Sequence, residues 1–201
     1  MKLLVSVDVE ADGPCPGLYS MVSFGAVVVE PALNRTFYGR TEPLAGATFM
    51  QAALDVSGTT REAHLAYSDK LRTMTDFYYW LRDLKAERLT FVSDNPAFDW
   101  QWINYYFHRF NAFQFDPVNP FGYSARRIGD IWSGYRRKFN DHSSWKDLRK
   151  TRHTHNPVDD AKGNAEALLE IMRLMEQPTE ALDMEEPMDL EDRLDALLKL
   201  P

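Results

Sequence analysis

The chain has 201 residues, of which 44% are hydrophobic, so its length suits one globular domain with a core and an appendage. Its one cysteine, Cys15, excludes an internal disulfide and is typical of proteins of the reducing cytoplasm. No stretch approaches the roughly 18 apolar residues of a membrane span, and the first apolar run reaches Asp8 too early for a signal peptide. We therefore expect a cytoplasmic protein that has no membrane partner.

The net charge of -7 is unevenly distributed along the chain. Residues 176–201 hold nine acidic and two basic residues, so the rest of the chain has 21 of each and is neutral. Within that part, residues 126–155 hold nine Lys or Arg and three Asp. This basic window can serve phosphate binding although the chain as a whole is acidic.

The first expected element is a buried strand over residues 3–10, and it ends in two acidic residues. Asp8 and Glu10 point to the same face because residues i and i+2 of a strand do so, while Val9 points the other way. Repulsion between two neighbouring carboxylates raises the pKa of one of them unless a cation lies between them. A hard divalent cation is the natural partner, because such cations prefer oxygen ligands. An Asp-x-Glu alone is better explained by a solvated strand end, so further acids are needed to favour a metal site.

A turn-rich loop over residues 11–17 follows, with Leu18 after it as an exposed apolar contact or a core residue. Strong strand patterns cover residues 21–30 and 35–44, and their short connection predicts an antiparallel start to the sheet. Gly25 lies inside the first of these strands, where a glycine indicates a bulge or the close approach of another backbone.

The middle of the chain alternates between helix and strand patterns. Residues 51–67 are expected to be irregular with short helices, and apolar spacing predicts a helix over residues 75–84. A short buried strand over residues 90–93 ends at a helix-start signal, and a helix over residues 98–110 follows. This alternation predicts an α/β fold.

Residues 98–123 contain eleven aromatic side chains, most of which are expected in the core. Trp100 and Trp102, near Asp99, are the candidates for stacking on a nucleic-acid base, a contact that contributes about 1–3 kcal/mol, and we single out Trp100. After a loop over residues 116–129, a strand end and helix are expected over residues 128–135.

A basic cluster precedes the last long helix of the body. It consists of Lys146, Arg149, Lys150, Arg152 and His153. A solvated face and a phosphate-binding surface are both open for this cluster, and Arg152 is our candidate substrate contact.

Residues 158–175 form a clear amphipathic pattern. Asp160 borders the apolar stripe of this helix, whereas Asp159 shares the expected wet side with Gly163 and Glu166. The spacing therefore favours Asp160 as the functional acid.

We expect an exonuclease-like domain over residues 1–176 and an appendage over residues 177–201. The appendage is an acidic linker followed by an amphipathic helix over residues 188–200. The apolar face of that helix suits docking on the body, or self-association into a homodimer.

Three of the candidate acids thus lie at or just after the end of a predicted strand or the start of a predicted helix. In an open α/β sheet, side chains at these positions can converge on one cleft. Four carboxylates, from Asp8, Glu10, Asp99 and Asp160, can hold two divalent ions. His155 lies five residues before Asp160 and can accept a proton from water, which typically contributes 10²–10⁴-fold.

Three motifs of the chain resemble, in their order and spacing, those of the DEDDh family of exonucleases. This family belongs to the proofreading-exonuclease-like superfamily, which also contains ribonuclease T and oligoribonuclease. The matching segments are residues 8–10, 95–99 and 155–161, and the resemblance spans roughly residues 3–173. The resemblance implies a ribonuclease H-like fold, an α/β fold with a mixed five-stranded sheet flanked by helices. It also implies 3′→5′ release of nucleoside monophosphates with two Mg²⁺ or Mn²⁺ ions.

The residues that match the family's metal ligands are Asp8, Glu10, Asp99 and Asp160, and His155 matches its general base. His153 does not have the matching spacing to Asp160, so we interpret it as a surface histidine in a basic run.

The chain departs from the family pattern beside the first motif. Ala11 and Asp12 stand where many relatives have threonines, and a Pro-Cys-Pro-Gly insertion precedes Leu18. Relatives often place a leucine near this position to wedge against the terminal base. Pro157 stands where alanine is frequent. No metal ligand is lost, so the departures concern substrate preference.

Our leading hypothesis is a metal-dependent 3′→5′ exonuclease that acts on the 3′ end of single-stranded RNA or DNA, with RNA slightly favoured by analogy. A non-catalytic nucleic-acid-binding module and a phosphodiesterase for short oligonucleotides are the alternatives. The complete set of five residues argues against the first, and the basic and aromatic runs fit longer strands better than the second.

Overall fold

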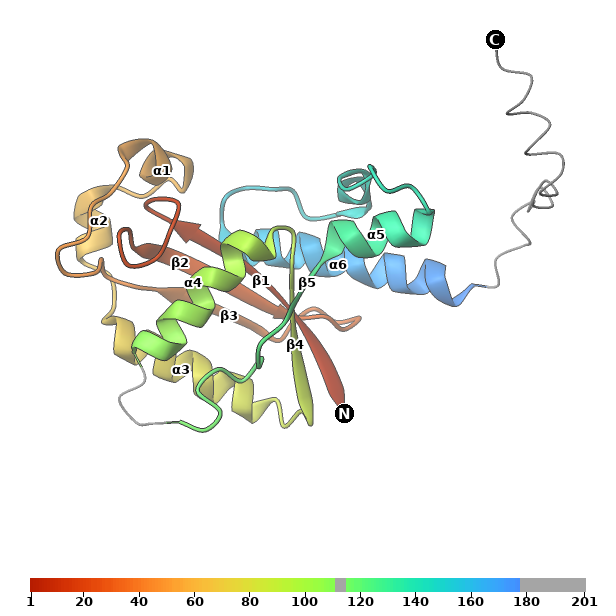
Figure 1. The fold of residues 1–201 in the computed structure, drawn as a ribbon, viewed down its shortest axis with the longest axis horizontal. Helices are drawn as coiled ribbons and strands as arrows, with labels where there is room; N and C mark the ends of the chain where they lie inside the picture. The colour runs from red at the N-terminus through yellow and green to blue at the C-terminus, as the bar shows by residue number, and fades with distance from the viewer. Residues whose placement is uncertain (111–114, 178–201) are drawn as a thin grey trace, which may run out of the picture.

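The computed structural model of the protein describes residues 1–110 and 115–177. Its strands are β1 (Lys2–Ala11), β2 (Met21–Val28), β3 (Thr36–Arg40), β4 (Arg88–Ser93) and β5 (Ala125–Arg127). They form one sheet in the order β3-β2-β1-β4-β5 (Figure 1). β1 pairs antiparallel with β2, and β2 with β3, whereas β1–β4 and β4–β5 are parallel. The predicted mixed five-stranded sheet and its antiparallel start are confirmed.

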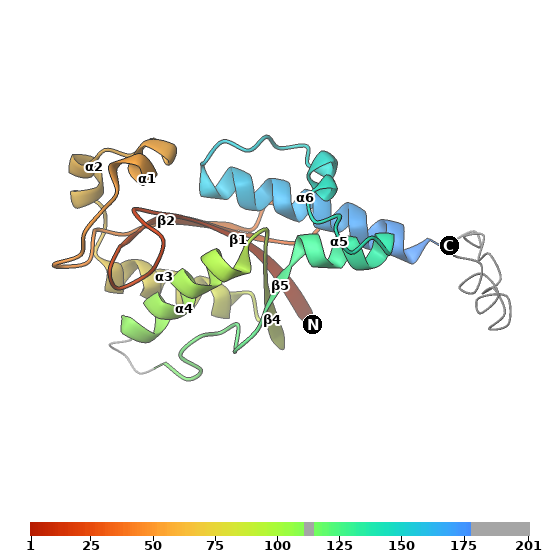
Figure 2. The same ribbon diagram turned by 45° about the horizontal axis from the view of Figure 1, so that its top comes forward.

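Helices cover both faces of the sheet. They are α1 (Gln51–Val56), α2 (Arg61–Leu65), α3 (Lys70–Asp83), α4 (Pro96–Arg109), α5 (Ile128–Arg136), the 3-10 helix η1 (Ser144–Leu148) and α6 (Pro157–Glu176). The main core joins β1, β2 and β4 to α3 and α4. On the other side, α6 packs against β2 and β1 (Figure 2). The helix α5 and η1 pack on α6 through a second apolar cluster around Trp132 and Trp145.

Two predicted boundaries are wrong. The helix α3 begins at Lys70, five residues earlier than its apolar spacing predicts, because the side chain of Asp69 accepts a hydrogen bond from Arg72 N at 3.0 Å and caps it. Residues 125–127, expected in a loop, form β5 because Ala125 and Arg127 pair with β4. Edge strands this short carry too little apolar pattern to stand out in a sequence.

The expected wet side of α6 is also wrong in part. Gly163 is buried, and a Cβ there would lie 2.9 Å from the carbonyl oxygen of Thr151. The carboxylate of Glu166 accepts hydrogen bonds from the backbone N–H groups of Lys150 and Thr151 at 2.9 and 2.7 Å. The loop over residues 149–156 therefore covers this face, and α6 holds that loop in place.

The predicted helix over residues 188–200, the linker beyond Gln177 and Phe113 lie outside the described residues. Docking and self-association of that helix therefore stay predictions, as does the boundary at residue 176. Among the residues that the structure describes, no helix is both long and apolar enough to cross a bilayer.

Gly25 has the close backbone contact that its place in a strand predicts. It pairs with Asp8 across β1 and β2, and a Cβ on it would lie 2.3 Å from the carbonyl carbon and oxygen of Pro157. The absence of a side chain lets the first turn of α6 lie directly on β2. This contact brings Asp160 to the face of the sheet that carries Asp8.

We expect Gly25→Ala to lower the free energy of unfolding by about 1–3 kcal/mol, the usual range for overpacking. The added Cβ would collide with backbone atoms of Pro157 and Val158, which cannot rotate away as a side chain could. Urea titration measures this change. Gly134→Ala in α5 is the matched control, because nothing lies within 4 Å of its added Cβ. Equal stability of the two variants would contradict the proposed close contact.

Candidate active site

The first two acids lie on the α6 face of β1. Val5, Val7 and Val9 belong to the main core on the other face, so the strand alternation turns Asp8 and Glu10 away from that core. The predicted common face of the two carboxylates is confirmed. Val9 points the other way, as expected.

Asp160 comes to the same place from the first turn of α6. Pro157 is the first residue of this helix, and the side chain of Asn156 caps it by accepting a hydrogen bond from Val158 N at 3.0 Å. One ligand oxygen each from Asp8, Glu10 and Asp160 lies within 4.8 Å of the others. Asp160 is only 1% exposed, as its place beside the apolar stripe predicts, whereas Asp159 is half-buried.

Asp99 is the fourth acid, and it lies in the first turn of α4. Its Oδ1 accepts a hydrogen bond from Val9 N–H at 3.1 Å, so the carboxylate is fixed against the end of β1. It is near enough to Asp8 to contribute to the raised pKa of that carboxyl. The structure thus brings together all four acids that the sequence singles out.

The four carboxylates give the site an excess of buried negative charge. Burial raises the pKa of Asp8 well above its ordinary value, and Asp99, Glu10 and Asp160 raise it further. Burial, and then the charge of Asp160, raises the pKa of Glu10 to about 7. Burial is also the main cause of the rise in the pKa of Asp99 to about 7. Such a cluster favours a bound cation, which would offset both the burial and the repulsion.

His155 faces this cluster from the loop before α6. Its Nδ1 lies 3.5 Å from Glu10 Oε1, and its side chain is 43% exposed. Its backbone has a φ of 58°, in the left-handed region, which non-glycine residues adopt at a cost and which is frequent at functional sites. The ring therefore lies beside the carboxylate cluster and is still accessible to solvent.

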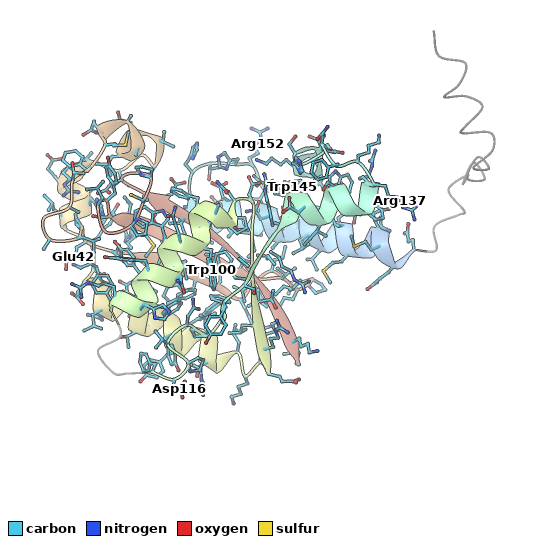
Figure 3. All side chains as sticks on the ribbon, viewed as in Figure 1. Glu42, Trp100, Asp116, Arg137, Trp145 and Arg152 are labelled. Carbon is cyan, nitrogen blue, oxygen red and sulfur yellow. The ribbon has the colours of Figure 1, made fainter. Side chains whose placement is uncertain are left out.

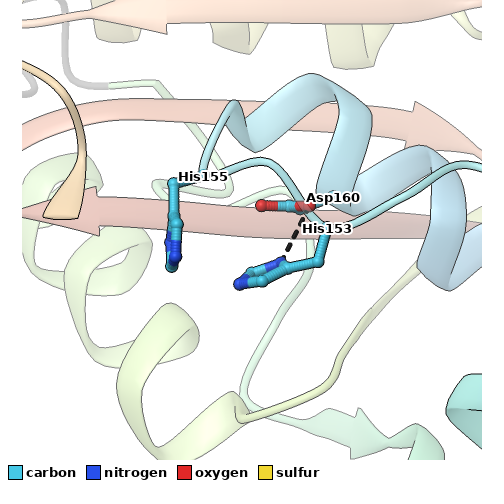
Figure 4. A group of neighbouring side chains, drawn as sticks. All are labelled: His153, His155 and Asp160. Carbon is cyan, nitrogen blue, oxygen red and sulfur yellow. Dashed lines mark ion pairs between the residues drawn. The ribbon is translucent and has the colours of Figure 1, made fainter.

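His153 is exposed, as expected of a surface histidine, but the structure places it at the site. Its Nδ1 lies 2.9 Å from Asp160 Oδ1, and its ring centroid is 4.3 Å from that of His155 (Figure 4). The motif spacing points only to His155. Sequence reasoning missed His153 because its contact depends on how the loop turns back toward α6.

The three candidate substrate contacts lie in different surroundings, and Figure 3 labels two of them, Trp100 and Arg152. Leu18 is 58% exposed and lies in the loop between β1 and β2. Trp100 packs edge-on against Phe91 and Phe121, with ring centroids 5.1 and 6.4 Å apart, so it belongs to the core packing rather than to the carboxylate cluster. Arg152 is exposed on the loop before α6.

Some residues of the basic cluster pair with neighbouring side chains, and others are exposed to solvent. Lys146 Nζ lies 2.7 Å from Asp94 Oδ2, and the largely buried guanidinium of Arg149 donates to Asn164 Oδ1. Lys150 and Arg152 remain exposed. The five residues of the cluster, with Asp94 and Thr151, line a pocket of about 410 Å³. This pocket lies beside the carboxylates, because His153 contacts Asp160. The side chains of Lys150 and Arg152 are therefore accessible to a phosphate group.

A second polar group was missed by sequence reasoning. Asp12 is buried, and its carboxylate accepts hydrogen bonds from Ser20 N at 2.5 Å and from Arg61 Nη1 at 3.2 Å. Arg61 also lies 3.4 Å from His64 Nδ1, and burial lowers the pKa of His64 to about 4. These contacts tie α2 to the loop that carries Leu18. The partners are about fifty residues apart in the chain, so no local pattern reveals them.

Comparison with known proteins gives one curated relative of high similarity. The "3'-5' DNA exonuclease Cap18" of Escherichia coli is 34% identical over 190 residues, which cover 88% of this chain and 95% of that protein. No family model matches the chain.

Solved structures share the fold at low sequence identity. Cell-death related nuclease 4 (CRN-4) has a TM-score of 0.68 at 16% identity, over 86% of this chain and 64% of that one. The nuclease domain of 3'hExo, described as a DEDDh family member bound to rAMP, has a TM-score of 0.63 at 12% identity, over 85% and 92%. E. coli exonuclease I in complex with a dA16 oligonucleotide has a TM-score of 0.60 at 12% identity, over 85% and 41%. The chain therefore spans less than two thirds of the CRN-4 and exonuclease I chains.

These structures establish the ribonuclease H-like fold that the three motifs imply. The carboxylates and the histidine of the motifs meet at one site on that fold. Together with the identity to the E. coli exonuclease over most of both sequences, this arrangement shows that the chain belongs to the DEDDh family of 3′-5′ exonucleases.

Proposed function

We propose that the protein removes nucleoside monophosphates from the 3′ end of single-stranded nucleic acid, with two divalent ions, Mg²⁺ or Mn²⁺, as cofactors. The observation that carries this proposal is the convergence of Asp8, Glu10 and Asp160 within 4.8 Å, with the ring of His155 beside them. A non-catalytic binding module has no need of this arrangement.

The residues fit divalent ions on two counts. Asp160 Oδ2 is buried without a hydrogen-bond partner, so a ligand position is left open. The raised pKa values of Asp8 and Glu10 come from burial and from neighbouring carboxylates, both of which a cation would offset. Asp99 completes the set of oxygen donors that Mg²⁺ and Mn²⁺ prefer. When bound, such ions activate a water molecule and stabilise the oxygen that leaves the phosphorus.

Residues of the chain itself can accept the proton and bind the substrate. His155 can accept the proton of the attacking water, because its ring faces the carboxylates and is still reached by solvent. Arg152 and Lys150 can bind the phosphates upstream of the scissile bond from the pocket beside the site. Leu18 can contact the terminal base from the loop that Asp12 holds in place.

We further propose that the preferred strand is DNA. The relative that is 34% identical is named a DNA exonuclease, and this likeness outweighs the general analogy that favours RNA in the sequence analysis. An enzyme distinguishes RNA from DNA through contacts to the 2′-hydroxyl of the sugar, so cleavage of the two kinds of strand must be compared directly.

Digestion of matched 5′-labelled single-stranded DNA and RNA tests both proposals. We expect a ladder of shortened, still-labelled products with Mg²⁺ or Mn²⁺, faster with DNA, and no products after chelation. Retained binding without cleavage in any metal would contradict the exonuclease proposal. Faster cleavage of RNA would overturn only the preference for DNA.

A further inference from the structure

The loop before α6 brings two imidazoles and a carboxylate together in a group that the nuclease motifs do not account for. One ligand atom each from His153, His155 and Asp160 lies within 4.8 Å of the others. Figure 4 shows the two rings next to each other beside the Asp160 carboxylate, and His153 Nδ1 lies 2.9 Å from Asp160 Oδ1. We propose that these three residues form a binding site for Zn²⁺, and that its occupation switches the nuclease off.

The donor set distinguishes this site from the carboxylate cluster. Two imidazole nitrogens and one carboxylate oxygen suit Zn²⁺, which takes such ligands at about 2.0–2.2 Å and commonly leaves a fourth position to water. Mg²⁺ prefers oxygen ligands throughout, and these are what Asp8, Glu10 and Asp160 provide. Asp160 belongs to both groups, so the two sites share one side chain.

The ligands can reach tetrahedral spacing through small movements. A tetrahedral ion at these bond lengths needs ligand atoms about 3.3 Å apart. The His153 and His155 side chains are 53% and 43% exposed, so their rings can reorient without disturbing the core. Asp160 supplies the fixed point, because Thr154 N–H donates to its Oδ1 at 3.0 Å.

Occupation of this site opposes the proposed reaction for two reasons. A His155 nitrogen bound to Zn²⁺ has no lone pair with which to take a proton from water. An Asp160 oxygen bound to Zn²⁺ also withdraws negative charge from the Mg²⁺ ligands, because the carboxylate is shared. His153 is therefore a regulatory ligand, which matches no position of the DEDDh motifs and captures the ion at the general base.

The first test measures binding without nucleic acid, on protein freed of any polyhistidine tag. Co²⁺ serves as the spectroscopic probe for Zn²⁺, in excess Mg²⁺ to fill the carboxylate site. We expect the intense visible absorption of tetrahedral Co²⁺ with nitrogen ligands, its displacement by one equivalent of Zn²⁺, and its loss in His153→Ala and His153→Asn. His108→Ala, which removes an exposed histidine of α4, is the control and should keep the band.

The second test, which rests on the proposed nuclease activity, measures the Zn²⁺ concentration that halves the rate at fixed Mg²⁺. We expect His153→Ala to raise that concentration at least about tenfold, because one of three protein ligands is lost, whereas His108→Ala leaves it unchanged. Weak, octahedral Co²⁺ absorption, or inhibition that is equal with and without His153, would overturn the zinc proposal. A chain with no nuclease activity but with the tetrahedral band would overturn the proposed function and leave the zinc site standing.

Discussion

Asp160→Asn is expected to slow 3′-terminal hydrolysis by at least about 10³-fold, which corresponds to roughly 4 kcal/mol of lost transition-state stabilisation. The substitution removes one of the converging charges that are proposed to hold the metal ions, and it preserves the size of the side chain. It also keeps an oxygen that can accept the hydrogen bond from Thr154 N–H. Single-turnover rates on a 5′-labelled strand measure the effect.

The stability of the metal-free variant separates a metal-ligand role from a structural one. The charge of Asp160 raises the pKa values of Asp8 and Glu10, so its removal relieves repulsion in the empty site. We therefore expect the melting temperature of metal-free Asp160→Asn to equal or exceed that of the parent, and the stabilisation by added Mg²⁺ to disappear.

Asp159→Asn is the matched control, because it changes the neighbouring carboxylate, which accepts a 3.3 Å hydrogen bond from Thr154 Oγ1. It should retain the rate within about threefold. Comparable losses in the two variants would show that the charge of the helix start matters, rather than metal ligation by Asp160.

The parts of the site that the sequence predicts are those set by local periodicity. Strand alternation places Asp8 and Glu10 together, and helical spacing separates Asp160 from Asp159. A glycine inside a strand pattern predicts a bulge or a close backbone approach, and at Gly25 the structure shows the close approach. Each of these inferences needs only the geometry of one element.

The parts that the sequence does not predict depend on partners far apart in the chain. Trp100 follows the candidate ligand Asp99 in the sequence, but its ring packs edge-on against Phe91 of the core. Helical spacing predicts that Glu166 faces solvent, because it carries no information about the loop that folds over this side of α6. The contact of Asp12 with Arg61 likewise joins segments 49 residues apart. Tertiary contacts of this kind leave no periodic signal.

His155→Gly is expected to lower kcat by about 10²–10⁴-fold, the usual contribution of a general base, while Mg²⁺ still stabilises the protein. Glycine is the informative replacement because residue 155 has a φ of 58°, which glycine adopts without strain. The four proposed acidic ligands are unchanged, so metal binding and proton transfer are tested separately in this variant and in Asp160→Asn.

Addition of free imidazole tests whether the lost group acts by taking a proton. The side chain of His155 is 43% exposed, so its removal leaves a space that opens to solvent and admits a small base. We expect imidazole to restore part of the rate of His155→Gly and none of the rate of Asp160→Asn. If imidazole rescues neither variant although His155→Gly still binds Mg²⁺, His155 orients the site rather than accepts the proton. The left-handed backbone at residue 155 then serves to aim the ring at Glu10, which lies 3.5 Å away.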